Sequence, residues 1–311
     1  MCGQKSCHLF LRHPLDTRPI LCDTPFASGR DGSNARPRFP VPRPLLSVIM
    51  KVNLFELLTS PPPKPSWLIP DMMTRGSLVA LCGVAGAGKS VLSYTLATAI
   101  AAGVPFLGRP ATQGRVLYFD EENGLPDLRP YLYRAWAGHG SPDPAKLATN
   151  LHVENFTLST RPDNWGGVMY DLARAVRPAL MIIDTATPAC HIKDENDNGE
   201  AAAAAAKIRL AQAAAGPDCT AIILKHLRVD PTSGKADMRG AKFWKGTVDA
   251  IWYLTRLQGR PLRNGLSRTA LDPEKVRAFG LQKGLIITPH ILGDGLALEG
   301  RERAAKEEES E

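Results

Sequence analysis

The 311 residues suffice for one large or two small domains, and 44% hydrophobic with 22% charged residues is an ordinary globular composition. No apolar run approaches the roughly 18 residues of a membrane span, the N-terminus lacks the apolar core of a secretory signal, and the six cysteines have no metal-ligand or disulfide-framework spacing, which favours a cytoplasmic protein. The net charge of +7 gives no argument for a nucleic-acid partner, because residues 1–49 alone carry seven Lys or Arg against three Asp.

Residues 1–60 are expected to be an N-terminal extension outside the folded core. Residues 1–49 contain seven prolines and no sustained period of 2 or 3.6, which is typical of a disordered arm, and a stiff Pro-rich linker follows at 61–65. Met50 opens a segment that looks like an ordinary protein start, so residues 1–49 are either a genuine basic arm or sequence that is not translated. The intact mass of the natively expressed protein distinguishes these two readings.

From about Trp67 the apolar runs alternate between strand and helix patterns, which predicts an α/β fold with a mostly parallel central sheet flanked by helices. The expected strands are nearly all apolar, as in a sheet covered on both faces. We expect this domain to span 67–295, with a β-rich C-terminal edge at 269–277 and 284–291, and an acidic tail at 296–311. The other expected strands are 78–82, 115–119, 179–183, 220–224 and 249–254, and the expected helices are 89–102, 126–137, 165–175 and 200–215.

A phosphate-binding loop is the strongest motif of the chain. Residues 83–90 match G-x-x-x-x-G-K-[ST] in full, between an apolar strand and a buried helix. The glycines let backbone N–H groups face a polyphosphate, and the helix N-terminus adds partial positive charge. Lys89 is expected to reach the β- and γ-phosphates, and Ser90 to ligate Mg²⁺. The predicted nucleotide contacts are Gly83, Val84, Ala85, Gly86, Ala87, Gly88, Lys89, Ser90 and Val91.

Two later strands run into acidic residues. Asp184 ends an apolar strand in the Walker B pattern, and it can hold Mg²⁺ directly or through water. Asp120, Glu121 and Glu122 follow strand 115–119, at an edge where open α/β sheets bind ligands. One of these carboxylates can orient and deprotonate the water that attacks a γ-phosphate, with Glu122 the first candidate and Glu121 the second. The alternative is a solvated turn.

These motifs, in this order, resemble the RecA-like branch of P-loop ATPases, and within it the AAA-domain ATPases of the RepA replicative-helicase type. The resemblance covers about 67–295 and implies a RecA-like fold with ATP and Mg²⁺ as cofactors. It also implies that Glu122 is the catalytic carboxylate and that His226, after the strand IILK, acts as a sensor near the γ-phosphate. The alternative for His226 is a hydrogen-bonded structural histidine. The matching segments are Trp67–Pro70 with Gly76, VLYFDEEN at 116–123, MIIDT at 181–185, the acidic DENDNGE at 194–200, IILKH at 222–226 and residues 239–254.

The resemblance further implies that the active site is completed by a neighbouring subunit. Lys275-Val276-Arg277 resembles the K-x-R element that reaches across to a neighbour's ATP, where a cation neutralises charge on the γ-phosphate. We therefore expect Lys275 and Arg277 to be catalytic in a homo-oligomer, such as a ring. The alternative is two surface cations on an edge strand.

A basic loop follows the expected sensor strand, where RecA-like proteins commonly face DNA. Phe243 and Trp244 lie close by and offer stacking surfaces, so the segment suits single-stranded DNA, with phosphates giving affinity and bases stacking. The alternative is a solvated loop with both aromatic rings in the core. The candidate DNA contacts are Arg228, Lys235, Arg239 and Lys242.

The sequence thus predicts an ATP-hydrolysing motor that acts on DNA in replication or recombination, similar to RepA-type helicases. A second hypothesis is a nucleotide-gated regulatory ATPase that assembles on a partner without unwinding, because no accessory helicase domain is evident and the charge of the core is modest. A small-molecule kinase is less favoured, since the acidic residues after the second strand and the late K-x-R suit hydrolysis.

Overall fold

The computed structural model describes residues 53–62, 64–155, 164–185, 198–229, 236–238, 241–258, 261–262, 265–277 and 279–303. The chain divides into two units between Pro61 and Pro62. Within the first unit, helix α1 (Leu54–Thr59) begins at Asn53, whose side chain accepts a hydrogen bond from the Glu56 N–H. Its large side chains are exposed: Leu54, Phe55, Leu57 and Leu58. The expected disordered arm at 1–49 lies outside the described residues.

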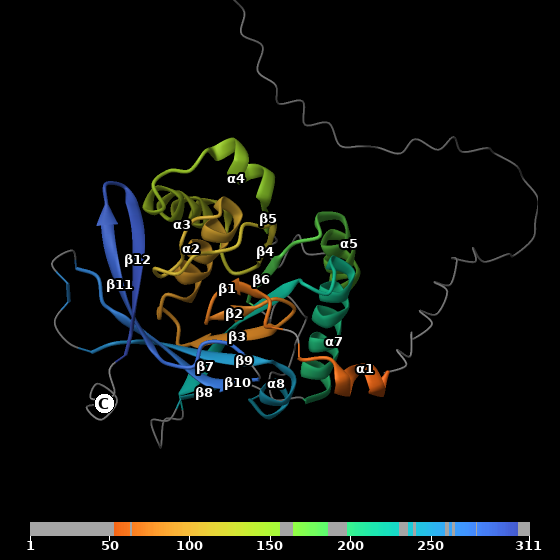
Figure 1. Ribbon diagram of the computed structural model, residues 1–311. Coiled ribbons are helices and arrows are strands. Elements are labelled where there is room, and N and C mark those ends of the chain that lie inside the picture. The colour runs from red at the N-terminus through yellow and green to blue at the C-terminus, as the bar shows by residue number, and fades with distance from the viewer. Residues whose placement is uncertain are drawn as a thin grey trace, which may run out of the picture. The chain divides into compact units, whose positions relative to one another are not determined.

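A ten-stranded sheet forms the centre of the described part of the second unit (Figure 1). The strand order is β12-β11-β10-β9-β3-β7-β6-β4-β5, with β8 paired to β7. Strands β9, β3, β7, β6, β4 and β5 are parallel, whereas β10, β11 and β12 add an antiparallel edge. The bounds are β3 (Leu78–Gly83), β4 (Val116–Asp120), β5 (Leu151–Asn155), β6 (Leu180–Asp184), β7 (Thr220–Val229), β8 (Ala236–Met238), β9 (Ala250–Arg256), β10 (Thr269–Val276), β11 (Leu285–Leu292) and β12 (Gly295–Glu302). Strands β1 (Trp67–Ile69) and β2 (Met73–Thr74) form a separate small sheet.

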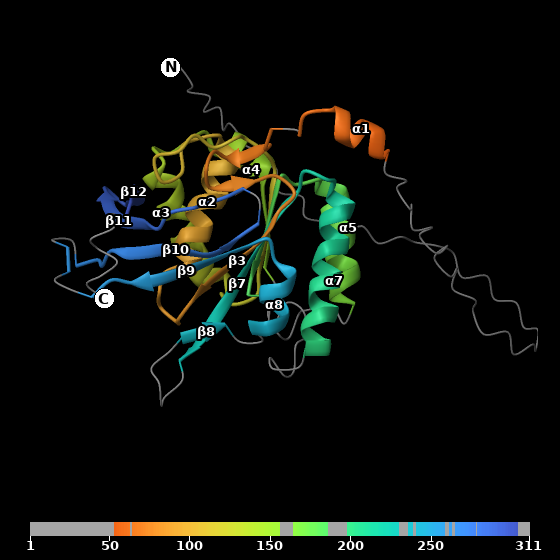
Figure 2. The same ribbon diagram turned by 60° about the horizontal axis from the view of Figure 1, so that its bottom comes forward.

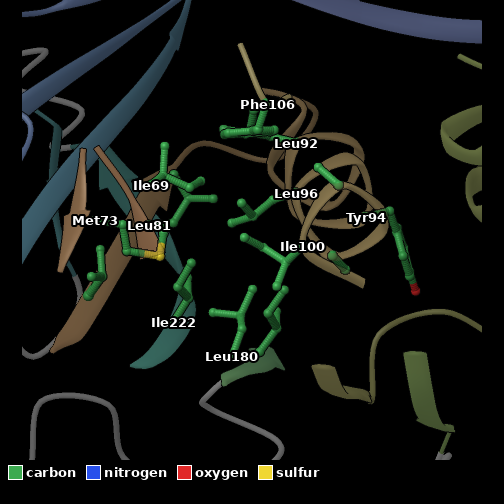
Figure 3. Packing of buried hydrophobic residues seen from close by; sticks show 14 of the residues in the cluster. Ile69, Met73, Leu81, Leu92, Tyr94, Leu96, Ile100, Phe106, Leu180 and Ile222 are labelled. Atoms are coloured by element: carbon green, nitrogen blue, oxygen red, sulfur yellow. The ribbon is translucent and has the colours of Figure 1, made fainter. Parts of the chain in front are cut away.

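Helices cover both faces of the central sheet, as Figure 2 shows. Alternate residues of a buried strand point to opposite faces, so each strand feeds two cores. On one face, Leu96 and Ile100 of α2 point toward Leu81, Leu180 and Ile222 (Figure 3). On the other face, residues such as Cys82 and Ile183 pack with α5, α7 and α8. The helices are α2 (Lys89–Ala102), α3 (Leu125–Gly138), α4 (Pro144–Asn150), α5 (Trp165–Val176), α7 (Asn198–Ala215) and α8 (Ala241–Thr247).

This architecture confirms the predicted α/β class, with a mostly parallel sheet flanked by helices and a β-rich C-terminal edge, and it agrees with a RecA-like P-loop fold. The expected tail at 296–311 is wrong over 296–302, because these residues form most of β12 and pair with β11. Leu298 packs against the hydrophobic core there, and the full ladder to β11 holds residues 295–302 as an edge strand. No described helix has the length and apolar character needed to cross a membrane.

Helix α3 and strand β12 touch backbone to backbone. A Cβ atom added at Gly138, the last residue of α3, would lie 2.1 Å from the Leu296 carbonyl oxygen, and one added at Gly295 would lie 2.4 Å from the Gly138 nitrogen. Only glycine allows this approach. The β11–β12 hairpin therefore rests directly on the carboxyl-terminal end of α3.

Candidate active site

The phosphate loop links the end of β3 to the start of α2. Gly86 and Gly88 have φ angles of 75° and 95°, in the left-handed region, and added Cβ atoms there would meet nothing within 4 Å. Backbone conformation, rather than crowding, therefore requires glycine at these two positions. Gly88 is the N-cap of α2 and contributes no side-chain cap. The first amides of α2 are thus available to an anion.

Lys89 lies along this loop with only 5% of its surface exposed. Its Nζ donates to the carbonyl oxygens of Gly83 (2.9 Å) and Val84 (3.1 Å). Burial lowers the pKa of Lys89, and the neighbouring Glu122 carboxylate opposes that shift. The ammonium group is therefore held beside the loop by two carbonyls, in a position to meet phosphate oxygens.

Sheet register brings the other predicted residues to the same edge. Gly83 pairs with His226 across β3 and β7, and Asp120 pairs with Asp184 across β4 and β6. Because β3, β7, β6 and β4 are neighbours and parallel, their carboxyl ends meet beside the phosphate loop.

His226 lies between Lys89 and Glu122. Its Nδ1 is 3.3 Å from Lys89 Nζ, and its Nε2 is 3.6 Å from Glu122 Oε2. An ammonium group can only donate, so Nδ1 accepts and the ring proton of a neutral His226 sits on Nε2, facing Glu122. A hydrogen bond from His226 is the main cause that lowers the pKa of Glu122. The three side chains form a continuous polar line from the phosphate loop to β4.

Asp184 is entirely buried at the end of β6. Its Oδ2 accepts a hydrogen bond from the Tyr118 hydroxyl at 2.9 Å, whereas its buried Oδ1 has no partner among the described residues. Burial raises the pKa of this carboxyl to about 7, and the hydrogen bond from Tyr118 and, to a smaller extent, the nearby Ser90 hydroxyl oppose that shift. A buried carboxylate with one unsatisfied oxygen, close to a serine hydroxyl, is a donor set that suits a hard cation such as Mg²⁺.

The described residues contain no cluster of three or more His, Cys, Asp or Glu that could hold a metal ion alone. Mg²⁺ at nucleotide sites commonly takes one or two protein ligands and completes its shell with phosphates and water. Ser90 and Asp184 therefore fit as a partial ligand set that a bound nucleotide would complete.

The acidic residues after β4 have different surroundings. Glu121 is buried, with 9% exposed, and its N–H donates to the Asp184 carbonyl oxygen at 2.8 Å. The Glu122 side chain is 42% exposed and faces His226. The accessible carboxylate is therefore Glu122. Asp120, which sequence reasoning did not single out, accepts hydrogen bonds from the backbone N–H groups of Glu122 (3.0 Å) and Asn123 (2.9 Å). An Asp that bonds to amides two and three residues later is a recognisable turn former, and that signal was present.

Lys275 and Arg277 lie at the other end of the parallel strands. Arg277 N–H donates to the Asp249 carbonyl just before β9, whereas the phosphate loop follows the opposite end of β3. Lys275 donates to the carbonyl oxygens of Lys245 and Val248 (2.8 Å for Val248), at the end of α8. Arg277 donates to the Gly246 carbonyl, and its side chain is 53% exposed. Neither residue joins the phosphate loop of its own chain.

The predicted DNA-facing segment is only partly described. Trp244 is fully buried and Phe243 packs against the same core, so the expectation of a stacking surface at Trp244 is wrong and the core alternative holds there. Lys235 and Arg239 lie outside the described residues. Arg228 belongs to β7 and Lys242 to α8, and only their backbone positions are described.

A recess adjoins the phosphate loop. Its walls come from the loop, from the start of α2, and from strands β9 and β12, and they include Gly88, Val91, Leu254, Arg256 and Leu298. Sequence reasoning did not find this recess, because half of its lining lies on strands far along the chain.

Residues 45–232, more than half of the chain, match the AAA domain family. The matched range contains the phosphate loop, Glu122, Asp184 and His226, and it ends before β9 and the antiparallel edge. The chain belongs to the AAA domain family and is an ATPase of the RecA/AAA type.

Proposed function

We propose that the chain hydrolyses ATP at the shared edge of β3, β4, β6 and β7. The observation that carries this proposal is the polar line Lys89–His226–Glu122, with contacts of 3.3 Å and 3.6 Å. Lys89 and the loop amides bind the phosphates. Glu122 orients the attacking water and takes its proton. His226 contacts both Glu122 and Lys89, so it connects the protonation of Glu122 with the lysine that binds the γ-phosphate.

The proposed cation ligands are Ser90 and Asp184, supported by the unsatisfied Oδ1 of Asp184. When bound, Mg²⁺ would offset phosphate charge as the bond to the γ-phosphate breaks. The recess beside Gly88 and Val91 suits the nucleoside, since its walls are largely aliphatic and Arg256 offers a guanidinium face for a base.

The direct test is release of phosphate from ATP by the purified full chain, with Lys89→Ala as the matched inactive variant. We expect steady release by the parent and none above background by the variant. Equal release by both would show that a contaminant, and not this site, hydrolyses ATP.

We further propose that the protein uses ATP hydrolysis to act on single-stranded DNA, as the resemblance to RepA-type helicases implies. Basic residues between 227 and 245 support this, while burial of Trp244 favours the second candidate, a nucleotide-gated ATPase without unwinding activity. Stimulation of phosphate release by single-stranded DNA, weakening as salt rises, is expected of the motor. No stimulation and no salt-sensitive binding would favour the second candidate.

A homo-oligomer, such as a ring, is the proposed working form, with Arg277 reaching a neighbour's nucleotide. Its exposure and its distance along the sheet from its own loop support action in trans. Lys275 donates to the carbonyl oxygens of Lys245 in α8 and of Val248 just after it, so we assign Lys275 the role of holding the end of β10, after which Arg277 follows. Mixing Lys89→Ala with Arg277→Ala should restore turnover in mixed assemblies; no restoration would argue against a shared site.

A further inference from the structure

Two buried tyrosines connect helix α2 with the acidic ends of β4 and β6. Tyr118, on β4, is fully buried, and its hydroxyl lies 2.9 Å from Asp184 Oδ2 and 2.7 Å from Ser93 Oγ. Tyr94, on α2, is also fully buried, and its hydroxyl is hydrogen-bonded to Asp120 Oδ2. The two rings stack with centroids 4.4 Å apart and planes 4° apart. The pair is thus a fixed unit that contacts both carboxylates.

The proton directions in this network follow from its chemistry. The Tyr118 hydroxyl donates to Asp184 and the Tyr94 hydroxyl donates to Asp120, so each carboxylate accepts. The single proton of Tyr118 is then committed to Asp184, and the Ser93 hydroxyl, 2.7 Å from the Tyr118 oxygen, also donates to the Ser90 carbonyl oxygen at 2.9 Å. One hydroxyl on α2, that of Tyr94, therefore donates to the carboxylate that ends β4, and one on β4, that of Tyr118, donates to the carboxylate that ends β6.

The Tyr94 contact extends to Glu122. While Oδ2 of Asp120 accepts from Tyr94, Oδ1 of Asp120 accepts from the N–H groups of Glu122 and Asn123. Asn123 also donates from its side chain to Asp120. The backbone at Glu122 is thus fixed to the Asp120 carboxylate, and that carboxylate is fixed by Tyr94.

We propose that Tyr118 and Tyr94 are positioning residues: Tyr118 turns Asp184 so that its Oδ1 faces the cation site, and Tyr94 fixes Glu122 through Asp120. This rests on the proposed function of the same site. It assigns separate tasks to two adjacent hydroxyl groups, one for cation binding and one for water activation. Tyr94 lies on α2, the helix that follows the phosphate loop, and the ring of Tyr118 stacks against the ring of Tyr94.

The competing explanation is that the hydroxyls only satisfy buried carboxylates. Burying a hydroxyl or a carboxylate without a hydrogen bond is unfavourable, so either account explains why the bonds exist. The two accounts differ in what the loss of one hydroxyl would change. A purely structural role lowers stability at both positions alike, whereas separate positioning tasks split the effects.

The experiment compares Tyr118→Phe, Tyr94→Phe and the control Tyr131→Phe. Tyr131 stacks on Tyr94 with centroids 5.8 Å apart and makes no hydrogen bond from its hydroxyl to another described residue. Thermal unfolding, kcat and KM are measured for each variant. The affinity for a fluorescent ATP analogue is measured in EDTA and across a Mg²⁺ titration, which reads cation binding without turnover.

Tyr118→Phe should raise the Mg²⁺ concentration needed for tight analogue binding by about 10- to 100-fold, the usual effect of losing an outer partner of a metal ligand, with EDTA affinity unchanged. Tyr94→Phe should lower kcat by at least about tenfold, with KM and the Mg²⁺ titration unchanged. Tyr131→Phe should match the parent. Should Tyr118→Phe not fold, Ser93→Ala removes the other partner of that hydroxyl together with the bond from Ser93 to the Ser90 carbonyl oxygen, and it should shift the Mg²⁺ titration in the same direction.

Parental Mg²⁺ dependence and kcat in both test variants would overturn the proposal, as would equal losses of stability and activity without the split. Failure of the proposed function looks different, because the parent itself would then show neither Mg²⁺-dependent analogue binding nor phosphate release.

Discussion

Replacing Glu122 with glutamine is the sharpest test of the candidate site. The amide keeps the size of the side chain but cannot take a proton from water. General bases contribute about 10²- to 10⁴-fold, so kcat should fall by that factor, equivalent to about 3–5 kcal/mol of transition-state stabilisation. The side chain is 42% exposed and its contact with His226 is 3.6 Å, so the free energy of unfolding should change by less than about 1 kcal/mol.

The assay combines phosphate release under saturating ATP, affinity for a fluorescent ATP analogue, and urea unfolding. Analogue affinity should remain parental, because the phosphate contacts of Lys89 and the loop are untouched. Glu121→Gln is the matched control, and since Glu121 is buried it should affect stability before chemistry. Unchanged turnover in Glu122→Gln would refute the assignment, and a hundredfold loss in Glu121→Gln at parental stability would move the base to Glu121.

Four further predictions concern the loop, the core and the cation. Lys89→Ala should weaken binding of the fluorescent analogue by about 10- to 100-fold, because a charged hydrogen-bond donor is lost; parental affinity would contradict this. Gly88→Ala should lower the free energy of unfolding in urea by about 1–2 kcal/mol because its φ is 95°, whereas Gly246→Ala, at an exposed position of α8 without a positive φ, should not. Ile100→Ala should lower the free energy of unfolding by about 2–5 kcal/mol in the same assay, since Ile100 is fully buried. A loss below about 1 kcal/mol would mean that neighbouring side chains fill the cavity left by Ile100. Chelation with EDTA should stop phosphate release and added Mg²⁺ should restore it, so turnover that persists in EDTA would argue against a cation at Ser90 and Asp184.

The sequence predicted the fold class and the main elements because buried parallel strands are nearly pure apolar runs. The predicted strands at 115–119 and 179–183 stopped one residue early, since Asp120 and Asp184 extend the ladder by pairing with each other. Strand β5 and helices α4 and α8 were missed, because they are short and their apolar positions are few.

The site was predictable where it follows from strand order alone. The carboxyl ends of parallel strands lie along one edge of a sheet, so residues near the ends of β4 and β7 come to the side of the loop although β6 separates the two strands, and His226 does contact Lys89 and Glu122. The tyrosines could not be found this way. Tyr94 and Tyr118 sit within apolar stretches, and only the packing of α2 on β4 turns their hydroxyls toward carboxylates. The recess could not be predicted from the sequence either, because β12 is far from α2 along the chain and lies near it only in the folded protein.

Helix α3 connects the turn that carries Glu122 with the β11–β12 hairpin. Its N-cap is Gly124, two residues after Glu122, and it ends at Gly138, against β12. Its 14 residues form a bar of about 21 Å between the turn that carries Glu122 and the hairpin that lines the recess. The hairpin and the turn that carries Glu122 therefore contact opposite ends of the same helix. Hairpin and helix would have to be exchanged together as one cassette, because a hairpin transplanted alone to alter nucleotide preference would also disturb the alignment of Glu122.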